Sequence, residues 1–130
     1  MTRRTLVAAV GAVITVGLVL VIERSVAAQS YPASYWTTRT MTVPVPSCLN
    51  AAKDAVSASG LSGITSTNVA TGGHTSTTRG YIICVRLPKA GACNGDGSTA
   101  VLVTAGSDAK ALLETMDKKL KTPVLIDCNK

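Results

Sequence analysis

The chain has 130 residues, of which 46% are hydrophobic and 15% are charged, with a formal net charge of +6 and no phenylalanine. We expect a chain of this length to form a single domain. The basic residues are scattered and are not interleaved with aromatic residues, a pattern that argues against nucleic acid as a partner.

The N-terminus has the order of regions found in export signals. Arg3 and Arg4 supply positive charge, residues 6–22 are almost wholly apolar, and residues 26–28 are small enough for cleavage. We predict a signal peptide over residues 1–28. Its removal takes away three of the 13 basic and one of the 7 acidic residues, which leaves 102 residues with a net charge of +4. The alternative is an uncleaved anchor that holds the domain outside the cytoplasm, and this is the only membrane contact we expect.

A short aromatic lead-in, residues 29–36, precedes the domain, which we place at residues 37–130. Alternating β-branched residues predict a strand over residues 37–43. Ser47 suits the N-cap of a helix over residues 48–59, because the apolar residues of that segment recur on one stripe.

The middle of the chain predicts three further strands. Residues 64–70 and 75–87 are joined by a glycine-containing turn at residues 71–74. The strand over 75–87 is apolar on both faces, so we expect it at the centre of the sheet. A glycine-rich loop covers residues 88–97, and the strand over residues 99–105 follows it.

The last part of the chain has the clearest helical periodicity. Ser107 suits an N-cap, and apolar residues recur at helical spacing as far as Leu120. Pro123 ends this helix, and residues 124–128 predict a short terminal strand. The order β-α-β-β-β-α-β predicts an α+β fold, a two-layer sandwich of one mostly antiparallel sheet with two helices on one face.

The chain has four cysteines, namely Cys48, Cys84, Cys93 and Cys128. Outside the cytoplasm such cysteines form disulfide bonds. They lack the close pairs typical of zinc sites and the Cys-x-x-Cys pattern of redox enzymes. Three pairings are possible. We favour Cys48 with Cys84, because the first helix is expected to pack on the central strand. That pairing leaves Cys93 for Cys128.

No set of residues predicts catalysis. His74 is the only histidine, and its neighbours in a glycine-threonine turn offer no acid or nucleophile. Asp96 is the one acid of its loop, too few for calcium. Glu114 and Asp117 lie one helical turn apart, where lysines can pair with them. The sequence therefore predicts no catalytic residues, no metal and no cofactor, and it favours a protein that is not an enzyme.

Three of the four aromatic residues, Tyr31, Tyr35 and Trp36, are concentrated in the lead-in. Two interpretations stay open. The aromatic residues form a flap over a bare sheet face, or they form an exposed platform for a sugar, a lipid interface or a protein. The apolar strand over residues 75–87 favours the flap. In the second interpretation these three residues are the candidate binding residues.

Three segments of the chain open a helix with a cysteine, place a cysteine in an aliphatic strand, and join a strand to a helix. They are Ser47-Cys48-Leu49, Tyr81-Ile82-Ile83-Cys84 and Val101-Leu102-Val103-Thr104-Ala105-Gly106-Ser107-Asp108. In these segments the chain resembles small exported bacterial proteins of unknown function. The resemblance covers roughly residues 37–121. It implies a fold and an exported location, but no activity. The other two cysteines of this chain are an extra pair outside that pattern.

Three functional hypotheses remain. The first is a secreted or periplasmic, non-catalytic domain that binds a protein or a cell-envelope component. The second is an extracellular protease inhibitor or effector, in which residues 91–97 would enter a cleft of the target. The third is a small hydrolase or thiol oxidoreductase, which would leave a free thiol in the redox case.

Overall fold

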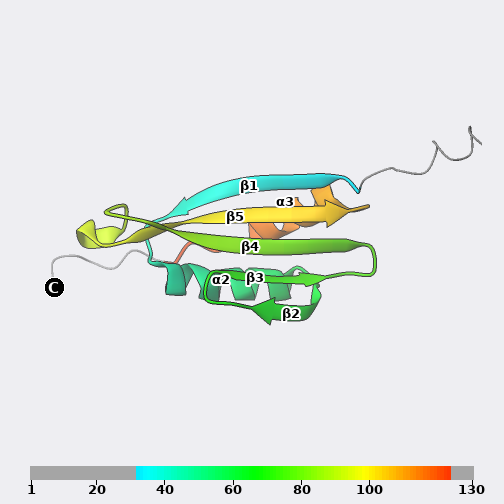
Figure 1. Cartoon of the computed structure of the whole chain (residues 1–130), viewed down its shortest axis with the longest axis horizontal. Helices are drawn as coiled ribbons and strands as arrows, with labels where there is room; N and C mark the ends of the chain where they lie inside the picture. The colour runs from blue at the N-terminus through cyan, green and yellow to red at the C-terminus, as the bar shows by residue number, and fades with distance from the viewer. Residues whose placement is uncertain (1–31, 124–130) are drawn as a thin grey trace, which may run out of the picture. The chain divides into compact units, whose positions relative to one another are not determined.

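The structure, a computed structural model, describes residues 32–123, which form one mixed α+β unit (Figure 1). Its elements in chain order are β1 (Ser34–Met41), α2 (Val45–Ala58), β2 (Ser62–Ser66), β3 (Ala70–His74), β4 (Thr78–Leu87), the 3-10 turn η1 (Ala92–Asn94), β5 (Gly97–Gly106) and α3 (Ala109–Lys119). The predicted export signal, Tyr31 and the predicted strand at residues 124–128 lie outside the described residues. Within them, neither helix combines the length and the hydrophobicity that crossing a membrane requires.

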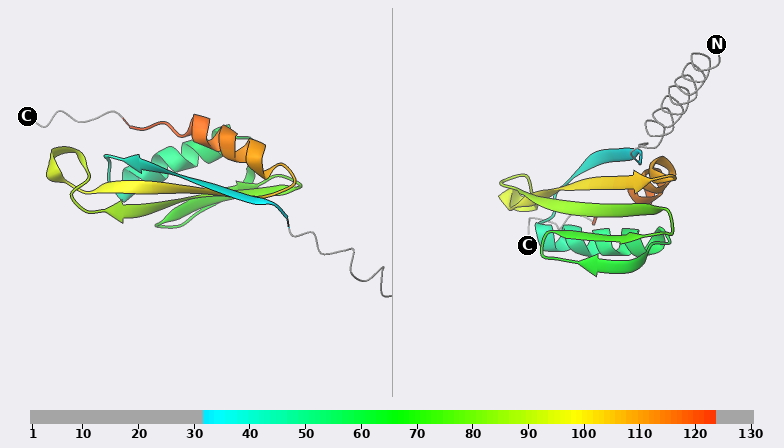
Figure 2. Two further views of the ribbon diagram at one scale, coloured as in Figure 1. Left: turned by 90° about the horizontal axis from the view of Figure 1, so that it is seen from above. Right: turned by 45° about the vertical axis from the view of Figure 1, so that its right-hand side comes forward.

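The five strands form one antiparallel sheet in the order β1-β5-β4-β3-β2. The strand β4 lies in the middle, as its apolar residues on both faces predicted. Figure 2 shows that α2 and α3 lie on the same side of the sheet. The helix α2 packs mainly on β4 and β3, and α3 packs mainly on β5 and β1. The predicted fold class, an antiparallel sheet with two helices on one face, is confirmed.

The core lies between the sheet and the helices and is built from aliphatic and small residues. Ile82 and Leu102 of the sheet are fully buried against Val56 of α2 and Met116 of α3. Gly80 in β4 allows α3 to approach the sheet closely, since a Cβ at this position would lie 2.7 Å from Sδ of Met116. The close contact between α3 and the sheet therefore depends on Gly80.

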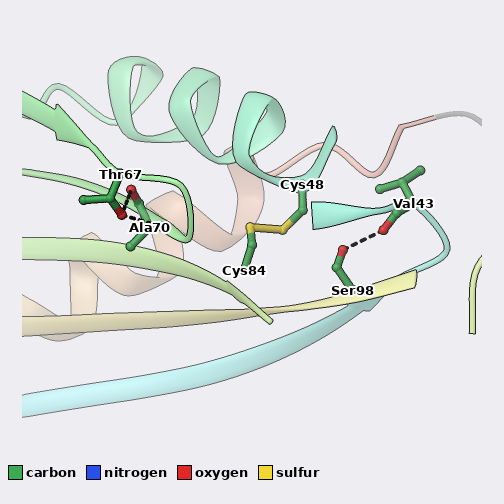
Figure 3. The surroundings of a disulfide bond; sticks show 6 residues. All are labelled: Val43, Cys48, Thr67, Ala70, Cys84 and Ser98. Carbon is green, nitrogen blue, oxygen red and sulfur yellow. Dashed lines mark hydrogen bonds between the residues drawn. A yellow bond between two sulfur atoms is a disulfide. The ribbon is translucent and has the colours of Figure 1, made fainter. Parts of the chain in front are cut away.

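The predicted disulfide between the first helix and the central strand is confirmed. Cys48 in α2 and Cys84 in β4 are joined, with 6.1 Å between their Cα atoms, and both side chains are buried (Figure 3). Nearby, the buried hydroxyl of Ser98 donates a hydrogen bond of 2.7 Å to the carbonyl of Val43. Cys93 is also disulfide-bonded. Cys128, the partner predicted for it, lies outside the described residues, so that pairing stays a prediction.

The prediction of a turn at residues 71–74 is wrong, because these residues form most of β3. The turns lie on either side of β3, and each is built on a threonine hydroxyl. Thr67 Oγ1 accepts two backbone hydrogen bonds at the entry to β3, and Thr75 Oγ1 accepts two at the entry to β4. Hydroxyl groups stabilise turns in this way without glycine. The pair Gly72-Gly73 therefore serves packing rather than chain reversal.

Both helices begin near their predicted positions but with different caps. The helix α2 starts at Val45, and Pro44 rather than Ser47 occupies its N-cap. In α3 the N-cap is Asp108 rather than Ser107. Neither cap residue makes a side-chain hydrogen bond to its helix. The first turn of α2 contains a proline instead, which is favourable there because a backbone N–H at that position has no partner within the helix.

Candidate functional site

The side of the sheet that faces away from the helices is called the open face here. In β4 and β5, buried side chains alternate with exposed or half-buried ones, as expected when only one face of a strand is packed. The pairing register extends this assignment to β1 and β3. The open face comprises Ser34, Trp36, Thr38 and Thr40 of β1, Thr99, Val101, Val103 and Ala105 of β5, Arg79, Tyr81, Ile83, Val85 and Leu87 of β4, and Ala70, Gly72 and His74 of β3.

The centre of the open face is apolar across four strands. Trp36, Val103, Tyr81 and Gly72 are successive cross-strand partners and form one row. Val101 and Ile83 are paired in the next row along the strands. The exposed fraction of Trp36 is 73%, which is unusual for the largest apolar side chain in the protein. A contiguous exposed patch of this kind marks an interaction surface more often than scattered single residues do.

The ring of Tyr81 lies over the backbone of Gly72. A Cβ on Gly72 would overlap Cδ1 of Tyr81, and it would lie only 2.7 Å from Cε1 of the same ring. Because Gly72 has no side chain, the ring can lie across the neighbouring strand and keep its other side toward solvent. The glycine that resembled a turn signal in the sequence therefore shapes the open face.

Charge is distributed unequally between the two layers. None of the open-face positions holds an aspartate or a glutamate. Four acidic residues of the described chain belong to the helical layer or its entry, namely Asp54, Asp108, Glu114 and Asp117. Arg79 is the only arginine or lysine of the open face, where it pairs across the strands with His74, and it makes no ion pair within the described residues. The open face is therefore apolar with positive charge at one end.

An ion pair lies at the opposite end of the sheet, outside the open-face positions. Nε of Arg86 donates a hydrogen bond of 2.7 Å to Asp96, and a second guanidinium nitrogen lies 3.2 Å from the other carboxylate oxygen. This hydrogen bonding raises the pKa of Arg86 above its ordinary value. The pair joins the end of β4 to the residue before β5. Asp96 is thus the one acid at the rim of the sheet layer among the described residues.

The structure separates two of the aromatic residues proposed for binding. Tyr35 and Trp36 are neighbours in β1, so their side chains project to opposite faces. Tyr35 lies on the helix side, in a hollow lined also by Asp108 and Glu114. Both residues are part of an edge strand paired with β5, so they extend the sheet rather than fold across it. Tyr31 lies outside the described residues.

Tyr81, and not Tyr35, shares the open face with Trp36. The sequence analysis did not identify Tyr81 as a binding residue. It shares a cross-strand row with Trp36, separated from it by Val103. The two-residue period of any strand was the available signal, because it places Tyr81, Ile83 and Val85 on one side of the strand predicted over residues 75–87. Pairing with the distant Trp36 could be found only from the strand order.

The residues considered for catalysis are not assembled into a catalytic set. The only hydrogen bond of the His74 ring within residues 32–123 joins Nδ1 to the carbonyl of Thr75, at 3.3 Å. The disulfide between Cys48 and Cys84 is buried, so an attacking thiolate cannot reach its sulfur atoms. What the open face presents is apolar and aromatic surface, with the side chains of Trp36 and Tyr81 exposed.

Comparisons with protein-family models, with curated proteins and with solved structures give no match for this chain.

Proposed function

We propose that this protein is a secreted or periplasmic, non-catalytic domain that binds a protein or a cell-envelope component through its open face. The observation that carries this proposal is the exposure of Trp36 in one row with Tyr81, on a sheet face without acidic residues. Aromatic side chains provide much of the binding energy of interfaces, because each one removes a large apolar area from water.

Two features support an exported location. The apolar residues 6–22 follow two arginines and precede small residues, the order of an export signal. The disulfide between Cys48 and Cys84 is compatible with an oxidising compartment outside the cytoplasm. The two cysteines of this bridge are buried and joined, so the domain can keep the bond in such a compartment.

Replacing Trp36 and Tyr81 together by alanine is expected to reduce retention of the protein on native envelope fractions by about 30-fold or more. This figure corresponds to a loss of about 2 kcal/mol, the usual threshold for an aromatic anchor. The measurement is a binding isotherm of the exported protein on washed envelopes. Both side chains are exposed, so the variant should retain its fold, which circular dichroism can verify.

The matched control is Tyr35→Ala, since Tyr35 is adjacent to Trp36 in sequence and as exposed as Tyr81, at 40%, but lies on the helix side. Retention should be unchanged in this variant. If the double variant and the unmodified protein were retained equally, the contact with the envelope would not involve the open face.

A second candidate function is that of an extracellular protease inhibitor or effector. It is favoured by the defined backbone conformation of the loop between β4 and β5. Lys89, Cys93 and Asn94 adopt positive φ values of 59°, 58° and 59°. The N–H of Ala92 donates a hydrogen bond to the carbonyl of Thr42, and Cys93 is disulfide-bonded. A loop held in one conformation loses little entropy when it enters a cleft.

This second function predicts inhibition of at least one extracellular protease at micromolar protein, with protection of residues 91–97 from cleavage in the complex. A panel of proteases of different specificity provides the measurement. Asn94→Ala is the informative variant, because alanine disfavours the left-handed conformation that Asn94 adopts. Full activity of every protease, together with an unprotected loop, would dispose of this function.

A further inference from the structure

We infer that the partner of the open face is a second copy of this chain, so that two sheets pack face to face around a two-fold axis. This inference rests on the proposed function, because it names the protein that the same face binds. Two-fold dimers are the commonest assemblies of soluble proteins, and their interfaces must be self-complementary. The size and the side-chain volumes of the open face meet that requirement, and its charge restricts the orientation of the two copies.

The open face has the size that a stable dimer needs. Its four strands are five to ten residues long. With strands about 4.8 Å apart and residues about 3.4 Å apart, the projected area is roughly 540 Å² in each copy. Side-chain relief increases the accessible area above this value. Standard interfaces bury about 800 Å² in each partner, so nearly the whole face would be used.

Side-chain volumes are complementary when β4 of one copy runs antiparallel to β4 of the other, which we call the antiparallel arrangement. The open-face residues of β4 are centred on Ile83, which places the two-fold axis near its row. The row of Trp36 and Tyr81 then lies over the partner row that contains Thr40 and Val85. Bulky side chains of one copy therefore meet smaller ones of the other, as the interdigitation of packed sheets requires.

Charge selects the same orientation. Arg79 lies at the end of the open face where β4 begins, and the opposite end of the sheet holds Asp96, whose carboxylate is already paired with Arg86. In the antiparallel arrangement the two Arg79 side chains therefore lie at opposite ends of the interface. In the parallel arrangement the two Arg79 side chains would meet each other, and contact between like charges opposes association.

The experiment is sedimentation equilibrium of the disulfide-bonded protein, purified in the form that export leaves, over a wide concentration range. We expect a reversible dimer in the unmodified protein. Ile83→Lys should weaken it by about 100-fold or more, because the axis brings two lysines together in an apolar contact. Trp36 is the only tryptophan, so its emission should shift to the blue as the dimer forms.

Ile64→Lys is the matched control. Ile64 and Ile83 have the same side chain and nearly the same exposed fraction, 37% and 36%. Ile64 lies on the helix side of the sheet, since a Cβ on Gly73 would point toward it at 3.5 Å and would also contact Leu61. The dimer should be unaffected by Ile64→Lys. A common loss in both variants would show that association does not depend on the open face and would overturn the inference.

The outcomes also separate this inference from the proposed function. A monomer at every concentration, with envelope retention still lost when Trp36 and Tyr81 become alanine, overturns the dimer and leaves the proposed binding role intact. A monomer whose retention is insensitive to that change refutes both. A dimer that Ile83→Lys disperses, with Trp36 emission following the same concentration dependence, supports the inference.

Discussion

Replacing Cys48 and Cys84 together by alanine is expected to lower the free energy of unfolding by about 2–5 kcal/mol. The two cysteines are 36 residues apart in sequence, and a loop of this length gives about 4 kcal/mol in the chain-entropy treatment of cross-links. Both side chains are buried, so their loss also leaves space between α2 and β4. Urea-induced unfolding, followed by circular dichroism, provides the measurement.

The comparison variant replaces Cys93 and Cys128 by alanine. Cys93 belongs to η1, in the loop between β4 and β5, and is exposed, so its bridge should contribute less to the cooperative core than the buried one. We expect a smaller loss of unfolding free energy than for the core disulfide, with the structural change confined mainly to that loop. If the two double variants lost equal stability, the core disulfide would have no special role in holding α2 on the sheet.

Gly106→Ala should destabilise the protein by about 3 kcal/mol, the combined effect of backbone strain and overpacking. Gly106 ends β5 with φ of 137°, a conformation that residues with a side chain rarely adopt. A Cβ there would also lie 2.6 Å from Cα of Thr78 in β4, where the backbone cannot move without breaking the strand pairing. The same urea titration measures the effect.

Gly60→Ala provides the control for conformational strain alone. Gly60 follows α2 with φ of 75°, and no atom lies within 4 Å of the position that a Cβ would occupy. Its replacement should cost about 1 kcal/mol, the usual penalty of the left-handed conformation. A loss at Gly106 no larger than that at Gly60 would show that the close approach to Thr78 does not limit the packing of β5.

The proposed dimer has a consequence for how the face is used. Trp36 and Tyr81 would be buried between copies, so a second partner would have to compete with self-association or use another surface. Envelope retention that falls as protein concentration rises would reveal such competition. Retention that is independent of concentration would indicate that the two contacts do not overlap.

Local patterns in the sequence determined the fold class and the central position of β4, and they favoured the pairing of Cys48 with Cys84 among three possible pairings. These predictions succeed because they depend on short-range physics. Apolar residues on both faces require a strand covered by neighbours, and helical periodicity identifies the face that packs on the sheet. Only tertiary structure assigned Gly72 to β3, because a glycine needed for contact with a ring and a glycine needed for a turn are identical in sequence.

The candidate site shows the same division. The sequence by itself determined that Tyr35 and Trp36 are close together and that a helix-covered sheet leaves one face bare. Strand alternation then separates these neighbours, and the order β1-β5-β4 brings Tyr81 into the row of Trp36 from 45 positions further along the chain. Pairing between distant strands depends on the packing of the whole sheet, and no local pattern of residues encodes it. For that reason the open face was decided by the tertiary structure alone.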